Sequence, residues 1–162
     1  MDDKVLMAHG SGGRLSHELI EKYLVPRLKN SILNRMDDAA DIDLKGRSAF
    51  TTDSYVIKPI FFPGGDIGRL AVCGTINDLS TRGAIPKYLS LSLIIEEGFL
   101  IADLERIITS ISSTADEAGV LVVTGDTKVV DHGNADGIYI NTSGIGLIPQ
   151  GIDISGSNAK EG

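Results

Sequence analysis

The spacing of apolar residues constrains the fold of this chain more than any other feature, because its period changes several times along the 162 residues. Helical spacing marks two segments and strand-like runs mark four: helices over 66–82 and 100–118, and strands over 48–57, 88–95, 120–129 and 137–148. In chain order these segments predict a β-α-β-α-β-β arrangement. We therefore expect an α+β sandwich in which helices cover a mixed sheet rather than a purely parallel one.

Residues that favour helix ends support these boundaries. Asp66 follows the chain break at Pro63-Gly64-Gly65 and is suited to cap the first helix, and Gly83 is suited to end it. Gly119 has the same terminating role for the second helix. Both predicted helices are thus bounded by residues whose chemistry favours a helix end.

The amino-terminal segment is expected to form a glycine loop that leads into a helix. The glycine-rich loop 8–13 follows a short apolar run, and apolar residues then recur at helical spacing up to Pro26. Proline lacks a backbone N–H and clashes with the preceding turn, so this helix should kink or end near Val25.

A hairpin is predicted between this helix and the first long helix. The segment 40–44 and the strand 48–57 flank Lys45-Gly46-Arg47, a short connection whose glycine can take a positive φ. We therefore expect 40–44 to pair with 48–57.

Composition limits the partners and the compartment. Only 5% of the residues are aromatic and none is Trp, so the core must consist of Ile, Leu, Val and Ala. The net charge of −7 disfavours nucleic acid as a partner, and a bound nucleotide would need positive charge supplied locally. No apolar run approaches the roughly 18 residues of a membrane span, and the amino terminus lacks a signal-peptide pattern. We therefore expect no membrane association and a cytoplasmic location.

The strongest chemical signal is a set of four aspartates in otherwise apolar segments: Asp38, Asp53, Asp78 and Asp126. A carboxylate in the middle of a strand is disfavoured unless a cation meets it. Hydroxyl groups beside these aspartates extend the set of oxygen donors: Thr51, Thr52 and Thr127. Oxygen-only donors suit Mg²⁺ that bridges nucleotide phosphates better than they suit zinc. Lys128 would supply the local positive charge.

Each aspartate also has a structural explanation. Asp78 could pair with Arg82 one turn later, Asp126 could serve a turn beside a glycine, and Asp38 could cap or solvate a loop. Asp53 fits such an explanation least well, because no neighbour in the sequence neutralises it. The metal-site hypothesis therefore depends on the four residues together.

Other reactive residue types give weaker signals. Successive amides in the glycine loop, followed by a helix start, suit phosphate oxygens: Gly10, Ser11, Gly12 and Gly13. The histidines lack the paired spacing of a helical zinc site. Cys73 is the only cysteine, so no intrachain disulfide is possible, and we expect it to be a buried small hydrophobic residue rather than a nucleophile.

Taken together, the motifs resemble one family. The stretches that carry the resemblance are 8–13 (AHGSGG), 38–40 (DAA), 50–54 (FTTDS), 61–68 (FFPGGDIG), 77–79 (NDL), 125–128 (GDTK) and 140–142 (INT). They are similar to the HypE family of hydrogenase-maturation dehydratases, within the aminoimidazole-ribonucleotide-synthetase (PurM-like) superfamily. The FFPGGDIG stretch is the more family-specific part, whereas the short aspartate motifs occur across the superfamily.

The resemblance implies a PurM amino-terminal-domain fold and an ATP-dependent reaction. In that reaction a carboxamide, carried as a thiocarbamate on the protein's own terminal cysteine, is dehydrated to a thiocyanate that supplies the cyanide ligands of nickel–iron hydrogenase. It assigns Mg²⁺ to the four aspartates and catalytic roles to Lys128 and Asp78. It assigns ATP binding to a wider set: Gly10, Ser11, Gly12, Gly13, Thr51, Asp53, Asn77, Asp78, Gly125, Asp126, Thr127 and Lys128.

The resemblance also implies partners and a domain division. It implies a homodimer that completes each site across the interface, and contacts with the carbamoyltransferase HypF and the HypC–HypD complex. Residues 1–154 would form the ATP-binding and dimerisation domain, and 155–162 a linker to a carboxy-terminal domain. That domain and its terminal cysteine are absent from this sequence, so the chain is expected to be an isolated half that is inactive alone.

Other functions remain open from the sequence. Thiamine-monophosphate kinase and selenophosphate synthetase are the alternatives within the superfamily. Selenophosphate synthetase would be expected to carry a reactive cysteine early in the chain, and none precedes Cys73. A non-enzymatic dimerisation module, in which the aspartates serve solubility and turns, is the alternative outside it.

Overall fold

A four-stranded mixed sheet forms the centre of the protein in the computed structural model, which describes residues 3–161. The strands are β1 (Ser48–Tyr55), β4 (Ile85–Glu96), β5 (Leu121–Val130) and β6 (Ile138–Leu147). Their order is β1-β6-β4-β5, with β6 antiparallel to both neighbours and β4 parallel to β5. The predicted α+β class with a mixed sheet is confirmed.

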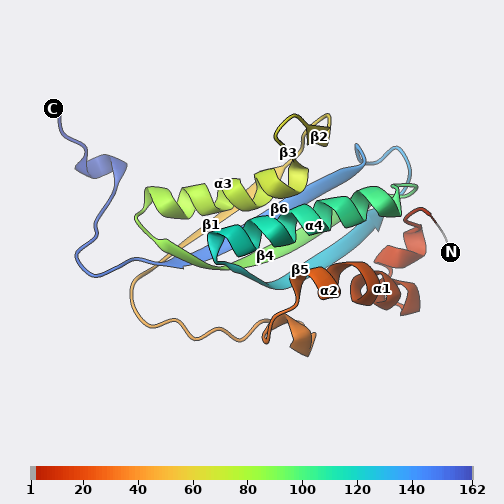
Figure 1. The fold of residues 1–162 in the computed structure, drawn as a ribbon, viewed down its shortest axis with the longest axis horizontal. Coiled ribbons are helices and arrows are strands. Elements are labelled where there is room, and N and C mark those ends of the chain that lie inside the picture. Colours follow the sequence, from red (N-terminus) through yellow and green to blue (C-terminus); the bar gives the residue numbers. More distant parts are fainter. Residues whose placement is uncertain (1–2, 162) are drawn as a thin grey trace.

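Two long helices cover one face of the sheet (Figure 1). They are α3 (Ile67–Thr81) and α4 (Ile101–Ala118). The core between helices and sheet is aliphatic, as the composition predicts, and its fully buried members include Leu89, Leu93, Ile107 and Ile111. Side chains on the other face are only partly buried, and β6 alternates strictly between buried and half-buried positions. The sheet therefore has one packed face and one open face.

The predicted helix ends are confirmed. The Asp66 carboxylate caps α3 by accepting a hydrogen bond from the Arg69 amide at 2.9 Å. Gly119 ends α4 in the left-handed region with φ 66°, and Gly83 follows α3 with φ 68°. Local chemistry thus sets both helices to within a residue or two of their predicted bounds.

The amino-terminal segment packs beside the β5 edge of the sheet. It comprises a 3-10 helix (Met7–Gly10), α1 (Arg14–Leu19), a π-helical segment (Ile20–Leu24), α2 (Val25–Leu28) and a 3-10 turn (Leu33–Arg35). The helix does not end at Val25. A π-helical turn directly precedes Pro26, so the helical hydrogen bonding is irregular where the proline was expected to act, while the helical path continues to Leu28.

The predicted pairing of 40–44 with 48–57 is wrong. The residues 40–44 form no strand, and β1 pairs instead with β6 from Ser48↔Leu147 to Tyr55↔Ile140. A long neighbour with matching register satisfies more backbone groups than a five-residue hairpin arm could. A small ribbon of β2 (Phe61–Phe62) and β3 (Gly65–Asp66) stands before α3, and a 3-10 turn (Gly156–Asn158) lies in the carboxy-terminal segment.

Candidate nucleotide site

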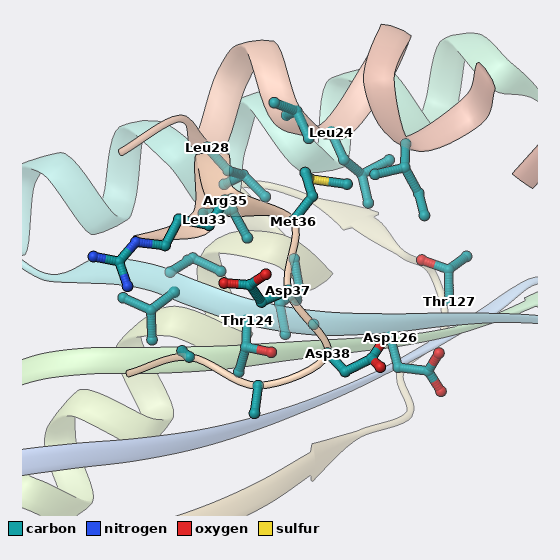
Figure 2. A pocket seen from close by; sticks show the side chains of 18 of the residues that line it. Leu24, Leu28, Leu33, Arg35, Met36, Asp37, Asp38, Thr124, Asp126 and Thr127 are labelled. Carbon is teal, nitrogen blue, oxygen red and sulfur yellow. The ribbon is translucent and has the colours of Figure 1, made fainter. Parts of the chain in front are cut away.

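A cavity of about 430 Å³ lies between β5, the amino-terminal helices and the segment 35–41. Its lining is apolar on one side, from side chains that include Leu24, Leu28 and Leu33, and acidic on the other. In Figure 2 the labelled leucines lie at one end, and Asp38 and Asp126 lie at the other. The folded chain thus brings Asp38 and Asp126 to one pocket from segments far apart in sequence.

The GDTK stretch and part of the glycine loop reach this pocket. Gly125, Asp126, Thr127 and Lys128 all line it, since β5 is the edge strand beside it. From the glycine loop, Gly12 lines the pocket, but its amide already donates to the Ser16 hydroxyl at 2.9 Å. The loop is therefore placed beside the pocket, and one of its expected phosphate donors, the Gly12 amide, is hydrogen-bonded to Ser16 of α1.

The loop's position depends on a close backbone approach. Gly10 lies against Val129 of β5, and a Cβ at Gly10 would overlap the Val129 backbone nitrogen. The Ser11 hydroxyl donates to the Ala8 carbonyl at 2.9 Å, and His9 Nδ1 accepts from the Leu6 amide. Ser11 and His9 thus serve the loop's internal structure.

Asp53 and Asp78 lie elsewhere, between β1 and α3. The Thr51 hydroxyl donates to Oδ2 of Asp78 at 3.1 Å, and the Tyr55 hydroxyl donates to Oδ2 of Asp53 at 2.9 Å. Asp78 therefore bonds to Thr51 rather than pairing with Arg82, the structural explanation considered for it. Thr52 points to the open face, where its hydroxyl donates to the Thr142 carbonyl at 3.2 Å.

Tyr55 lies next to Asp53 and Asp78 and contacts Asp53, a role that was not predicted from the sequence. Burial is the main cause that raises the pKa of Tyr55 to about 12, and the hydrogen bond to Asp53 and the charges of Asp53 and Asp78 contribute to the same rise. A signal for it was present, because residues two apart on a strand share a face and Tyr55 follows Asp53 by two. The phenol is thus neutral and a hydrogen-bond donor at neutral pH.

The four aspartates form two pairs, Asp38 with Asp126 at the pocket and Asp53 with Asp78 between β1 and α3. Within one chain the sheet separates these two acidic pairs. Asp53 aligns with Thr142 on β6, which aligns with Leu91 on β4 and Gly125 on β5. Three strand spacings amount to roughly 14 Å, so Asp53 and Asp126 lie at opposite sheet edges. Among residues 3–161 no three His, Cys, Asp or Glu side chains are grouped closely enough to hold a metal ion. One chain alone does not form the predicted four-aspartate cage.

Each pair nevertheless fits a magnesium ion bound together with phosphates. Magnesium in nucleotide sites is held by one or two carboxylates, with phosphate oxygens and water completing its octahedron. The donors present are carboxylate and hydroxyl oxygens in both places: Asp53, Asp78 and Thr51 at β1–α3, and Asp38, Asp126 and Thr127 at the pocket.

Two residues on α3 have unexpected positions. Cys73 is exposed, so the prediction that it is buried is wrong. The buried face of α3 runs through Ala71, Val72 and Thr75, and Cys73 falls off that face. Asn77 is also exposed and lies outside the pocket lining.

Comparison with known proteins places this domain in a family. Residues 36–148 match the family described as AIR synthase related protein, N-terminal domain. The chain belongs to this family, whose fold is the α+β domain with a mixed sheet found here. Over 159 residues it is 54% identical to carbamoyl dehydratase HypE of Azotobacter vinelandii, covering 98% of this chain and 47% of that protein.

Solved structures agree with this assignment. A structure described as the hydrogenase maturation protein HypE in complex with ATP superposes with a TM-score of 0.95 at 52% identity, covering 97% of this chain and 47% of that one. A HypE–HypF complex matches with a TM-score of 0.71 at 51% identity, covering 93% of this chain and 47% of that one. The chain thus spans about half the length of the relatives it matches. No helix within residues 3–161 has the length and apolar character needed to span a membrane.

Proposed function

We propose that this chain is the ATP-binding half of an ATP-dependent carbamoyl dehydratase that acts in hydrogenase maturation. The observation that carries the proposal is the pocket at the β5 edge, where an apolar wall faces Asp38, Asp126 and Lys128. An apolar wall suits a purine base, and carboxylates with a lysine suit a magnesium-bound triphosphate. The ATP complex of a relative of 52% identity supports this reading.

The proposed reaction converts a protein-bound S-carboxamide into a thiocyanate. Transfer of the γ-phosphoryl group of ATP to the carboxamide oxygen makes that oxygen a leaving group. The C–O bond then breaks to release phosphate, and the nitrogen loses its two protons as the C≡N bond forms. Of this chain's residues, Lys128 would stabilise the negative charge on the phosphates. Asp78 would hold the magnesium ion next to the phosphoryl group that is transferred. A bound Mg²⁺ would offset the charge that develops there.

The wider set of ATP contacts follows from the two places described above. We assign Gly10, Ser11, Gly12 and Gly13 to the phosphates, as a backbone cradle beside the pocket in which the Gly12 amide would exchange its bond to Ser16 for one to a phosphate oxygen. The remaining assigned contacts are Thr51, Asp53 and Asn77 near β1–α3, and Gly125 and Thr127 on β5.

A second copy of the chain would bring the β1 edge of one sheet next to the β5 edge of the other. The open face of the sheet carries Phe50, 69% exposed on β1, and Ile94, 42% exposed on β4. If two such faces packed about a two-fold axis along the strands, β1 of one copy would lie opposite β5 of the other. The β1 edge, which carries Asp53, would then lie beside the partner's β5 edge and its pocket, and this arrangement supports a homodimer with composite sites.

The proposed partners are other maturation proteins. The carbamoyltransferase HypF would load the carboxamide, and the HypC–HypD complex would receive the cyanide group. Support for HypF comes from the HypE–HypF complex.

Calorimetric titration with ATP and Mg²⁺ tests the nucleotide proposal. We expect binding by the wild-type chain and its loss in Asp53→Asn and in Asp126→Asn, which remove charge without changing shape. Asp116→Asn, at an exposed position near the end of α4, is the matched control and should bind as wild type does. Undiminished binding in both site variants would refute the assignment.

Sedimentation tests the proposed homodimer. It should show a dimer, and a monomer at all concentrations would refute the composite site.

A further inference from the structure

A line of hydroxyl groups runs beneath α3 and ends on the Asp53 carboxylate. Thr142 on β6 and Thr75 on α3 are fully buried, and Tyr55 at the end of β1 is 8% exposed. The Tyr55 hydroxyl donates to Oδ2 of Asp53 at 2.9 Å and lies 3.4 Å from the Thr75 hydroxyl. The Thr75 and Thr142 hydroxyls are hydrogen-bonded to each other. The line therefore connects the buried core to one carboxylate of the proposed site.

The direction of these hydrogen bonds follows from the acceptor at the far end. A carbonyl oxygen can only accept, so Thr142 donates its single hydroxyl proton to the Ala71 carbonyl at 3.2 Å. Thr75 must then donate to Thr142. The Tyr55 hydroxyl has one proton and donates it to Asp53, so it lies beside the Thr75 hydroxyl without sharing a proton with it. An ionised carboxylate can only accept, so the bond between Tyr55 and Asp53 has the phenol as its donor.

Packing fixes the position of the Tyr55 hydroxyl. Gly74 of α3 lies over the ring, and a Cβ at this position would overlap the phenol oxygen. Tyr55 and Asp53 are two residues apart on β1, so both side chains point toward α3. The hydroxyl thus reaches the Asp53 carboxylate from its buried side and engages only one of the two oxygens.

We propose that Tyr55 is a positioning residue, whose hydroxyl holds Oδ2 of Asp53 so that Oδ1 is presented to the magnesium ion of Mg-ATP. This role rests on the proposed function, since it requires Asp53 to bind that ion. A carboxylate already held by a neutral donor loses less rotational freedom when it binds a cation. The hydrogen bond also keeps the carboxylate in the orientation that the cation needs.

The test uses Tyr55→Phe, which removes the hydroxyl and keeps the ring. Tyr23→Phe makes the same change in the π-helical segment and is the matched control. Calorimetry at fixed ATP gives the Mg²⁺ concentration at which ATP binding is half-maximal. We expect this concentration to rise about tenfold in Tyr55→Phe, the size of one lost hydrogen bond to a charged group. Tyr23→Phe should match wild type, and saturating Mg²⁺ should restore wild-type ATP affinity to Tyr55→Phe.

The outcomes separate this role from the proposed function. If the wild-type chain binds Mg-ATP and Tyr55→Phe has the same Mg²⁺ dependence, the positioning role is overturned and the nucleotide proposal stands. A loss of ATP binding that saturating Mg²⁺ does not restore also overturns it, because that result indicates a purely structural role. If the wild-type chain binds no ATP at any Mg²⁺ concentration, both proposals are overturned.

A measurement on the wild-type chain covers the case in which Tyr55→Phe does not fold. With ¹³C-labelled tyrosine, adding Mg²⁺ to the ATP-bound chain should shift the Tyr55 Cζ resonance in the NMR spectrum, because the ion binds the carboxylate that this hydroxyl contacts. A Tyr55 resonance that does not respond to Mg²⁺ overturns the positioning role.

Discussion

Replacing Gly74 by alanine should destabilise the protein, although alanine is the better helix former. A glycine-to-alanine change inside a helix contributes roughly 1 kcal/mol of stability through helix propensity. At this position the new Cβ would overlap the Tyr55 hydroxyl and lie 3.0 Å from Cζ and 3.1 Å from Cε1 of the ring. Overpacking of this kind costs roughly 1–3 kcal/mol. Because the overlap falls on the phenol oxygen itself, the overpacking cost lies in the upper part of that range, roughly 2–3 kcal/mol. Subtracting the propensity gain leaves a net loss of about 1–2 kcal/mol, or a Tm lower by roughly 2–8 °C.

A double-mutant cycle locates the cause of that loss. In Tyr55→Phe the overlapping oxygen is gone and only the two ring-carbon contacts remain tight, so Gly74→Ala should be close to neutral there. Urea unfolding of the four proteins at one protein concentration gives the coupling free energy, expected to be at least about 1 kcal/mol. Stabilisation by Gly74→Ala in the wild-type background, or an equal effect in both backgrounds, would refute this account of how α3 packs on β1.

Two further predictions concern the helix cap and the response to pH. Asp66→Ala removes the carboxylate that accepts from the Arg69 amide, and should lower the unfolding free energy by about 1 kcal/mol in urea titrations; an unchanged midpoint would show that the cap is not needed. Hydrogen bonds from the Gly133 and Gly137 amides lower the pKa of Glu96. Its stabilising contribution is therefore present above the ordinary glutamate pKa and is lost as pH falls through the lowered value. Glu96→Gln should flatten the acid limb of the stability–pH profile, and an unaltered limb would contradict this.

The functional residues were predicted unevenly from the sequence. The pocket contains Asp38, Asp126 and Lys128. The sequence indicated all three, because each lies in a short motif of consecutive residues. The grouping of the aspartates was not predictable in the same way, since it depends on strand order. Tyr55 was missed because a tyrosine at the end of a strand, followed by Val56 and Ile57, has the pattern of an ordinary core residue.

Local chemistry determined the elements of this protein. Asp66 and Gly119 set helix ends through contacts within a few residues, and the period of apolar residues set the β-α-β-α-β-β order. These features depend on neighbours in the chain, so the sequence alone was enough to predict them.

Tertiary structure decided the rest, because pairing and burial depend on residues far apart in the chain. The segment 40–44 lost its predicted partner when β1 paired with β6, about 90 residues later in the sequence. The same strand order placed Asp53 and Asp126 at opposite edges of the sheet, and the packing of α3 left Cys73 exposed. Which distant segments pair with each other depends on the free energy of the whole core. A local sequence pattern therefore cannot predict it.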